Sequence, residues 1–474
     1  MQGTSAREGA HVISTSKRRV ALLVAACYFM EMLDGTILVT AAPRLSVALH
    51  VTSAAIGLLM AAYLIVMSVV IPLGGWLDAR IGSRTLFLSS IALFTVASLA
   101  CGGAQNFGEL LVARVVQGVG AALMVPVGRT IVLARAEKTD IMRLIGYVVW
   151  PGLLAPVVAP LLGGFIVTYA SWRWLFWVNV PLGIVAVMVG AVTVESTAPR
   201  RDRTAFDHWG MVVTTFGLGS LLWAAYVAGE PSGSWRVVGG FALIGVAALA
   251  EAARHLRRRT EPYVELAVLR VRSLRDALGG VAAFVVVVGA LPLLLALLFQ
   301  DDFAWSPLKS GVVLAGIFVG NIAIKPATTP ILTRISHKRV LLASTATVAA
   351  TVVAFSLLHR TTPVGLIVAL SVLSGAARSM GFSAYVTRFY ADVPESLMGA
   401  ATTVTATVQQ LFFGVALSAA VVALRLGSSV APMSSGPTDR YRVAFLLLAV
   451  VALVAMTLAS TMERSAGHSL RASP

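Results

Sequence analysis

The chain has 474 residues, of which 58% are hydrophobic and only 12% charged, and its mean hydropathy is +0.86. An ordinary soluble domain is about 25% charged, so this composition excludes a soluble globular fold. The 41 glycines show no three-residue period, which excludes a collagen-like chain. Continuous apolar runs of about 20 residues are long enough to cross the membrane as helices, whereas barrel strands would alternate over about ten residues. The sequence predicts an all-α polytopic membrane protein.

Fourteen apolar runs are predicted to span the membrane, and the run at 236–252 is the weakest. They lie at about 20–42, 53–74, 85–104, 109–133, 144–168, 174–194, 209–229, 236–252, 276–299, 310–333, 339–358, 363–387, 398–424 and 441–462. The first run is too long for the apolar core of a signal peptide and lacks a small-residue cleavage site. We therefore expect an uncleaved first span.

The 37 basic residues sort unevenly between the two predicted sides of the membrane, and the net charge is +16. With an even number of spans, 25 of these residues fall on the side of the termini, eight on the other side and four inside spans. Because cytoplasmic loops carry the excess of Lys and Arg, both termini are predicted to be cytoplasmic. The basic balance thus indicates topology rather than nucleic-acid binding.

An internal repeat predicts two parallel halves. Trp76 opens WLDARIGSRTLFL after the second span, and Pro330 opens PILTRISHKRVLL after the tenth. At a fixed offset, Arg80 aligns with Arg334, Ile81 with Ile335 and Arg84 with Lys338. The predicted segments are a cytoplasmic tail (1–19), an N-terminal six-helix bundle (20–194), two inserted helices (195–252), a cytoplasmic linker (253–275), a C-terminal six-helix bundle (276–462) and a second cytoplasmic tail (463–474).

Two carboxylates in the first span are the leading candidates for chemistry. An ionisable side chain at the membrane centre costs about 2.5–3.5 kcal/mol on insertion scales, so its presence indicates function. Glu31 and Asp34 are three residues apart on one helical face. Two carboxylates in one low-dielectric site do not both stay ionised, so one can gain and lose a proton near neutral pH. We expect Asp34, with Glu31 second, to carry a proton or a cationic substrate; alternatively, Asp34 is a permanently ionised partner of Arg114.

Four basic residues lie inside predicted spans. Arg114 and Gln117 share a face of the fourth span, and Gly118 allows close helix approach. Arg129 lies about 22 Å further along the axis and either reaches the interface or lines a cavity. The remaining two, Lys325 and Arg378, are expected to line a substrate cavity, although Lys325 could instead extend to the interface.

Four in-span bases against two acids leave room for anionic or zwitterionic substrates. Gln409 and Gln410 are expected to offer neutral hydrogen bonds to substrate, with one of the pair facing away. Trp150 is a further cavity candidate, whereas the other tryptophans near span ends are expected to be interfacial anchors. Cys27 and Cys101 are expected to be small core residues, because their spacing fits neither a metal site nor a disulfide framework.

The fifth span contains three prolines and a Gly-Gly pair. Pro151, Pro156 and Pro160 cannot donate backbone hydrogen bonds, which predicts a kink, and Gly163 and Gly164 allow tight packing. A kinked and closely packed helix suits an interface that rocks and seals against proton leak. A purely structural kink is the alternative.

Motifs at the start of the chain resemble those of the major facilitator superfamily. FMEMLDGTILVTAAP (29–43) is similar to the LDxTIVNxALP signature of its fourteen-span drug:proton antiporter branch (EmrB/QacA type), with Val39 where the family usually has Asn. GWLDARIGSR (75–84) is similar to the GxLaDRxGRR loop, with Ala79 at the usual Asp position and Asp78 one place earlier.

Later motifs extend this resemblance. LLVARVVQGVGAALMVP (110–126) is similar to the RxxQGxGaa pattern. PGLLAPVVAPLLGG (151–164) resembles the antiporter motif, with Ala155 and Ala159 where glycine is usual, and SWRWLFWVNVPLG (171–183) resembles the SWRWIFxINxPxG connection.

The resemblance covers about 18–463 and implies the major facilitator fold: two six-helix bundles, here with two inserted helices, that rock about a central site. It makes Arg114 a relay that responds to protonation of a nearby acid. It implies that the 75–84 loop latches the cytoplasmic side. The residues given conformational roles are Gly75, Asp78, Arg80, Gly82, Arg84, Pro156, Pro160, Gly163 and Gly164.

We therefore expect a proton-coupled antiporter that exports drugs or other small amphipathic compounds across the bacterial cytoplasmic membrane. The sequence contains no phosphate-binding loop, metal-ligand cluster or Gly-x-Ser-x-Gly turn, so we expect no enzyme and no cofactor besides the proton gradient. Expected partners are a small-molecule substrate and the lipid bilayer, without nucleic acid, for a monomer; any periplasmic adaptor is left open. The alternatives are a dedicated metabolite exporter, a gradient-driven importer or a non-transporting sensor.

Overall fold

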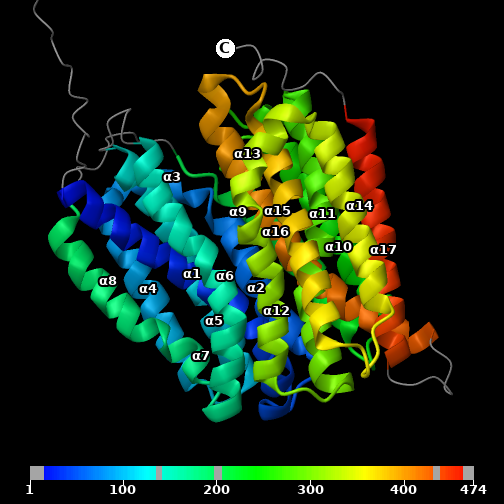
Figure 1. Ribbon diagram of the computed structural model, residues 1–474. Helices are drawn as coiled ribbons and strands as arrows, with labels where there is room; N and C mark the ends of the chain where they lie inside the picture. The colour runs from blue at the N-terminus through cyan, green and yellow to red at the C-terminus, as the bar shows by residue number, and fades with distance from the viewer. Residues whose placement is uncertain (1–14, 135–140, 197–204, 431–437, 463–474) are drawn as a thin grey trace, which may run out of the picture.

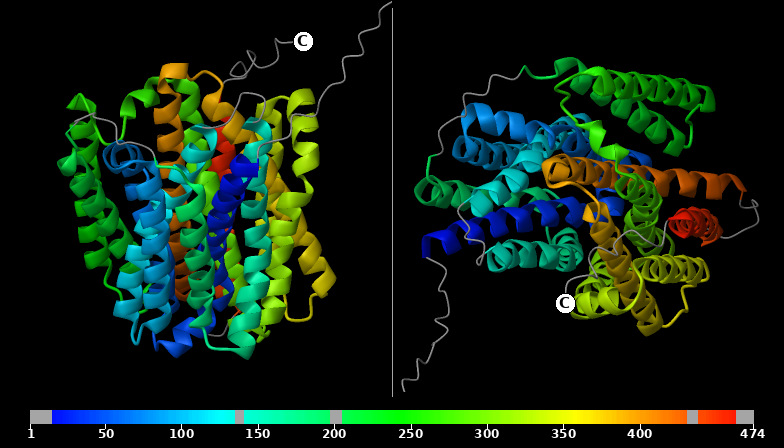
Figure 2. Two further views of the ribbon diagram at one scale, coloured as in Figure 1. Left: turned by 90° about the vertical axis from the view of Figure 1, so that its left-hand side faces the viewer. Right: turned by 90° about the horizontal axis from the view of Figure 1, so that it is seen from above.

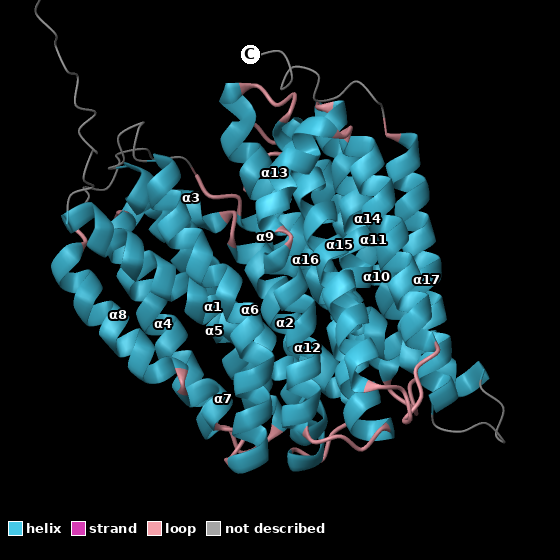
Figure 3. Ribbon diagram, viewed as in Figure 1, coloured by secondary structure: helices cyan, strands magenta, loops and turns pink. Residues whose placement is uncertain are grey.

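The computed structural model describes residues 15–134, 141–196, 205–430 and 438–462, and in these ranges it is helical with short connections (Figure 3). The first half contains α1 (Thr15–Ala48), α2 (Ser53–Val70), α3 (Leu73–Ile81), α4 (Ser83–Gly103), α5 (Phe107–Ala134), α6 (Ile141–Tyr169), α7 (Trp174–Trp177) and α8 (Asn179–Thr193). The middle contains α9 (His208–Gly229) and α10 (Trp235–Arg258).

The second half follows with η1 (Leu266–Arg270), α11 (Arg272–Leu297), η2 (Leu298–Asp302), α12 (Pro307–Ala323), α13 (Lys325–Arg334), α14 (His337–Ser356), α15 (Val364–Tyr390), η3 (Glu395–Leu397), α16 (Met398–Val430) and α17 (Thr438–Thr461). In the described residues, 13 helices are long and apolar enough to cross a membrane, or 14 if α12 and α13 form one bent span. Thirteen of the fourteen predicted spans, including the weakest one in α10, coincide with these helices, and the tenth predicted span coincides with the bent pair.

Three connections differ from the sequence-based expectation. The motif at 75–84 is mostly helical, because α3 runs to Ile81 and ends only where Gly82 takes a φ of 81°, a backbone conformation that favours glycine. The tenth predicted span is two helices, α12 and α13, bent by 47°. The segment at 253–275 is not simply a linker, since α10 continues to Arg258 and α11 begins at Arg272.

Two helical bundles stand side by side and contact each other mainly along two seams, with a smaller contact between α1 and α11 (Figure 1). Helices α1, α2 and α4–α8 form one bundle, and α11, α12 and α14–α17 form the other. The seams join α2 to α16 and α6 to α12. The pair α9–α10 lies at the edge of the molecule, where α9 packs on both α2 and α16 (Figure 2, right). The inserted pair therefore borders one seam.

The internal repeat is visible as matching hydrogen bonds in the two halves. Arg84, at the start of α4, donates from Nη2 to the carbonyl of Ala191 in α8 at 2.6 Å. Lys338, at the start of α14, donates from Nζ to the carbonyls of Ser460 and Met462 at the end of α17, the latter at 2.9 Å. In each bundle, the third long helix thus binds the end of the sixth through the aligned basic residue. These bonds, α3 and α13 lie on the side that the charge distribution predicts to be cytoplasmic (Figure 1).

Candidate functional site

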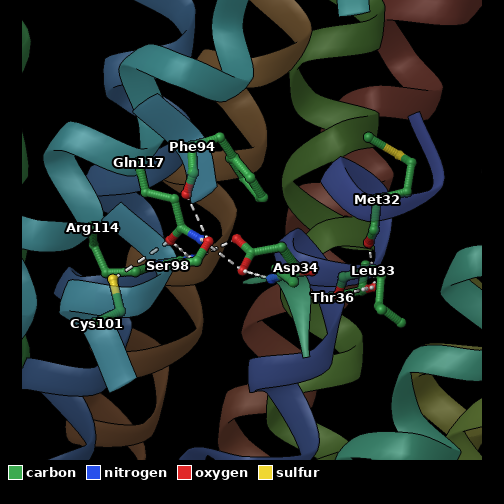
Figure 4. Close-up of polar contacts among 10 residues, drawn as sticks. Met32, Leu33, Asp34, Thr36, Phe94, Ser98, Cys101, Arg114 and Gln117 are labelled. Atoms are coloured by element: carbon green, nitrogen blue, oxygen red, sulfur yellow. Dashed lines mark hydrogen bonds and ion pairs between the residues drawn. The ribbon is translucent and has the colours of Figure 1, made fainter. Parts of the chain in front are cut away.

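Asp34 lies at the centre of a buried hydrogen-bond network in the first bundle (Figure 4). Its Oδ2 accepts from Arg114 Nη1 of α5 at 2.6 Å. Its Oδ1 accepts from Gln117 Nε2 and from Asn179 Nδ2 of α8, each at 3.0 Å. The side chain of Asp34 has no exposed surface and that of Arg114 only 1%, so this ion pair is removed from solvent. A buried pair of this kind needs further hydrogen bonds to be stable. Here both Asp34 oxygens accept hydrogen bonds, whereas Arg114 Nε has no hydrogen-bond partner among the described residues.

The positive charge of Arg114 is stabilised from several directions. Gln117 Oε1 accepts from its Nη1 at 2.7 Å. The rings of Tyr63 and Phe176 face the guanidinium, with centroids 4.2 and 5.7 Å from its Cζ. Such cation–π contacts are worth about 2 kcal/mol when desolvated. Arg114 therefore has both an anionic and an aromatic partner.

Glycines in α5 bring the surrounding helices close enough to build this network. A Cβ at Gly118 would lie 3.0 Å from the carbonyl oxygen of Tyr63 in α2. A Cβ at Gly120 would lie 2.7 Å from the backbone nitrogen of Phe94 in α4. Because the obstructing atoms are backbone, no side chain can move aside. The Arg-x-x-Gln-Gly-x-Gly spacing thus combines two functions on one helix. Arg114 and Gln117 supply polar side chains, and Gly118 and Gly120 allow the close helix packing that buries them.

Glu31 lies one turn from Asp34 but outside its network. The residue is 5% exposed, and its Oε2 has no hydrogen-bond partner. Tyr28, a further turn along α1, carries Arg129 over its ring, with Cζ 4.8 Å from the centroid. The first span therefore holds one fully bonded carboxylate and one with an unsatisfied oxygen. Arg129 lines a cavity, as one of its two sequence-based interpretations predicts.

A cavity of about 590 Å³ lies between the bundles on the side of α3. Its walls come from α3, α5, α6 and α16, so both bundles contribute. Gly75 and Asp78 of α3 line it, and a Cβ at Gly75 would meet no atom within 4 Å. On the predicted cytoplasmic side, the bundles are therefore separated by open space.

The predicted latch residues contact their own bundle around this cavity. Asp78 accepts a hydrogen bond from Ser83, between Oδ1 and Oγ, at 2.5 Å. Arg80 stacks over the ring of Trp76, with Cζ 4.3 Å from the centroid. Together with Gly82 at the end of α3, these contacts shape the α3–α4 corner and do not cross to the second bundle.

The opposite side of the molecule is closed where α6 crosses α12. A Cβ at Gly164 would lie 2.6 Å from the carbonyl oxygen of Pro307, and a Cβ at Gly311 would lie 2.1 Å from that of Pro160. On its other face, Gly163 packs against the carbonyl of Ile37 in α1. Pro156 lies in the same helix, which continues from Ile141 to Tyr169 through all three prolines. The three prolines therefore do not break α6 into separate helices.

The second bundle places Arg378 near the middle of α15. Its Cζ lies 5.5 Å from the ring centroid of Phe318, 5.8 Å from that of Phe413 and 5.9 Å from that of Phe382. Lys325 lies at the bend between α12 and α13 and donates from Nζ to Ser383 Oγ at 3.3 Å.

The other predicted cavity residues have different surroundings. Gln409 and Gln410 are half-buried on α16, one turn from Phe413. Gln117 belongs to the Asp34 network and is fully buried, so both ends of its amide are used inside the protein. Trp150 is 53% exposed and is absent from the lining of the cavity at α3.

Sequence reasoning missed several members of the network. Ser98 of α4 accepts from Gln117 Nε2 at 2.7 Å, and Cys101 donates from Sγ to Gln117 Oε1 at 3.6 Å. Asn179 and Tyr63 were not singled out either, although Asn179 stands inside a quoted motif. A buried asparagine at the start of an apolar run is the signal that could have identified it.

Comparisons with known proteins agree with this architecture. The model of the Major Facilitator Superfamily matches residues 24–417 and 277–471. A protein named "Putative multidrug resistance protein MdtD" from Pectobacterium carotovorum subsp. carotovorum (strain PC1) is 30% identical over 447 residues, covering 94% of this chain and 95% of its own length. A protein of the same name from Klebsiella pneumoniae (strain 342) is 31% identical and covers 85% of each chain.

Solved structures share the fold at low sequence identity. The POT family transporter PepTSo has a TM-score of 0.63 at 14% identity, with 95% of this chain and 98% of that chain covered. The xylose transporter XylE from E. coli, in a partially occluded inward open conformation, has a TM-score of 0.62 at 12% identity, with 95% and 99% covered. Because the family model matches most of its length and a relative 30% identical covers 94% of it, the chain belongs to the major facilitator superfamily.

Proposed function

We propose that this protein is a proton-coupled antiporter of the fourteen-span EmrB/QacA-type branch that exports drugs or other small amphipathic compounds from the bacterial cytoplasm. The buried Asp34–Arg114 pair carries this proposal, since a desolvated ion pair at mid-membrane depth is costly without a role in transport. The names of the MdtD relatives support a drug-like substrate. We further propose a location in the inner membrane, function as a monomer, and the proton gradient in place of any cofactor or catalytic chemistry.

The arrangement supports an inward-facing state of an alternating-access cycle. The cavity at α3 opens between the bundles on the predicted cytoplasmic side, while α6 and α12 touch through backbone on the other. A substrate enters from the cytoplasm and leaves after the bundles rock and the α6–α12 contact opens. We propose that the outward movement brings the α3 corner, with Gly75, toward α16.

We propose that the two carboxylates of α1 provide the proton coupling. A proton that reaches Asp34 removes the charge that pairs with Arg114, which must then find other partners. Because Arg114 also contacts Gln117, Tyr63 and Phe176, this change reaches α2, α5 and the α7 segment at once. We propose that Glu31, with its unsatisfied Oε2, receives the proton first from the cytoplasmic cavity. The altered pairing then biases the equilibrium between inward and outward states.

Substrate-driven proton movement in proteoliposomes tests this proposal. We expect Asp34→Asn to abolish proton movement and Glu31→Gln to reduce it, because each removes a carboxylate that can exchange a proton. Both variants should retain substrate counterflow, which exchanges substrate for substrate without protons and reports intact folding. Asp276→Asn is the matched control, since Asp276 is partly exposed and pairs with Arg272 at 3.7 Å. Proton movement by Asp34→Asn that equals wild type at every pH would overturn the coupling assignment.

A further inference from the structure

Arg378 is a positive charge in the middle of the second bundle without a carboxylate partner. It is near the centre of the 27-residue α15, and its Nε has no hydrogen-bond partner among the described residues. The acids of residues 276–462 all lie near helix ends; they are Asp276, Asp301, Asp302, Asp392, Glu395 and Asp439. A cation at membrane depth is unfavourable unless an anion or polar surroundings compensate it. The described residues supply no anion to Arg378.

The other in-span charges do not change this imbalance. Both in-span acids, Glu31 and Asp34, are on α1 in the first bundle. Arg114 pairs with Asp34, and Arg129 stacks over Tyr28, one turn from Glu31. Arg378 and Lys325 therefore leave an excess of two positive charges in the second bundle.

Arg378 is surrounded by three aromatic rings, two of which come from helices that form the seams between the bundles. Phe318 comes from α12 and Phe413 from α16, the two helices of the second bundle that pack most extensively on the first. Phe382, one turn along α15, completes the set and stacks on Phe413 with centroids 6.0 Å apart. Arg378 keeps part of its surface exposed. Its guanidinium thus lies beside apolar rings that come from helices bordering the first bundle, and it is not fully enclosed.

One face of α16 connects the cytoplasmic cavity to Arg378. Gly399, Thr402 and Ala406 line that cavity. Residues three and four apart share a helix face, so the same face continues through Gln409 and Gln410 to Phe413. Phe413 is one of the rings against Arg378. Along α16, polar side chains therefore lie between the cavity at α3 and the ring-lined guanidinium.

We infer that the substrate is an organic anion whose carboxylate pairs with Arg378 while its apolar part lies against Phe318, Phe382 and Phe413. This inference rests on the proposed transport function and specifies its substrate class. The planar guanidinium binds a carboxylate through two parallel hydrogen bonds, and the rings favour an aromatic or aliphatic body beside it. Lys325 supplies the second positive charge, at the bend toward the cytoplasmic end of α12. A lipophilic cation is disfavoured there, because it would meet two like charges.

Binding of a matched ligand pair to the purified full-length protein tests the inference. 2-Naphthoate and 2-naphthamide share one ring system and differ in charge. We expect naphthoate to bind at least about tenfold more tightly, and Arg378→Gln to remove that preference. Arg254→Gln is the control, since Arg254 is exposed and pairs only with Glu251 in the described residues. Equal affinities of wild type for the two ligands would overturn the inference, and this comparison decides the matter even if Arg378→Gln does not fold.

Transport separates failure of this inference from failure of the proposed function. Proteoliposomes with a proton gradient are given carboxyfluorescein, an aromatic anion, or ethidium, an aromatic cation. Proton-driven movement of carboxyfluorescein, lost in Arg378→Gln and kept in Arg254→Gln, supports the inference. Movement of ethidium alone overturns the inference but leaves the proposed function standing. Movement of neither compound, together with no ligand preference in the binding assay, contradicts both.

Discussion

Gln117 uses its whole side-chain amide within the buried network around Asp34. Its Nε2 donates to Asp34 and Ser98, and its Oε1 accepts from Arg114. We expect Gln117→Leu to destabilise the protein by several kcal/mol, because each buried polar group that loses its partner costs about 1–3 kcal/mol. Thermal unfolding of the purified protein in detergent measures this loss.

Ser98→Ala is the matched control for this prediction. It removes two neutral hydrogen bonds, the one that Ser98 accepts from Gln117 and the one that it donates to the carbonyl of Phe94. The contacts of Asp34 with Arg114 stay intact, so the cost should be about 1–3 kcal/mol, at about 0.5–1.5 kcal/mol for each bond. If Gln117→Leu unfolds at the same temperature as Ser98→Ala, the network does not act as a connected unit.

At this scale the sequence predicts the charged members of the site and misses the neutral ones. Glu31, Asp34 and Arg114 stand out because charge is rare and costly inside apolar runs. Ser98 and Asn179 cost little in a helix, and Ser98 could equally have bonded only its own backbone, as it also does at the carbonyl of Phe94. Their pairing with Gln117 and Asp34 depends on which helices meet, and a single sequence does not contain that information.

The crossing of α6 and α12 is the element whose substitution should change the conformational equilibrium. A Cβ at Gly164 would lie 2.6 Å from Pro307 O and 2.9 Å from Leu308 Cα, which are backbone atoms. We expect Gly164→Val to prevent closure of this side and to favour the outward state. A cysteine placed at Thr402, which lines the cytoplasmic cavity, should then react more slowly with a membrane-impermeant maleimide from the cytoplasm. The rate should fall by roughly tenfold, since each 1.4 kcal/mol shifts a population by that factor.

The control is Gly365→Val at the start of α15, where an added Cβ meets nothing within 4 Å. Cys27 and Cys101 are buried, so they should not contribute to the labelling. An unchanged rate at Thr402→Cys in the Gly164→Val background would show that the α6–α12 contact does not control access to the cavity.

At the element scale, the sequence predicts spans well and their ends poorly. Hydropathy locates the thirteen long apolar helices and the bent pair α12–α13, because lipid requires about 20 apolar residues for each crossing. It misses α3, whose residues are too polar to resemble a span, and the 47° bend after α12. Pro326, at the second position of α13, explains why a new helix can start there.

At the scale of the whole molecule, polar contacts hold the inserted pair α9–α10 at both of its ends. On the outer side, Arg425 of α16 donates to the carbonyls of Val227, Ala228 and Gly233. On the inner side, Asp207 contacts Nε2 of His255 in α10 at 2.8 Å. Because α9 also packs on α2, this pair contacts both bundles.

Lowering the pH should weaken the contacts of Asp207 with His255 and with the neighbouring backbone N–H groups. Burial opposes the charge of Asp207, but the contact with His255 and the backbone N–H groups of Gly210 and Tyr263 outweigh it, so its pKa lies below the ordinary 3.8. A lowered folded-state pKa stabilises at neutral pH, and this stability is lost as the pH falls through the lowered value. We expect Asp207→Asn to lower the free energy of unfolding by about 1.5–3 kcal/mol at pH 7. Below the lowered pKa of Asp207, the variant and the wild type should differ little in stability.

Thermal unfolding between pH 7 and pH 3 measures the gap between the two proteins. Glu251→Gln serves as control, because its exposed ion pair with Arg254 contributes little at any pH. A gap between Asp207→Asn and wild type that stays constant across the range would contradict the assignment.

The matched bonds of Arg84 and Lys338 have a mechanical consequence. Each ties the third long helix of its bundle to the last one, at the end of the molecule where the cavity opens. Neither bond crosses from one bundle to the other. Each bundle can therefore rotate as a rigid body, because its third and sixth long helices stay bonded to each other. In the rocking cycle that we propose, the rearrangement would then concentrate at the α2–α16 and α6–α12 seams.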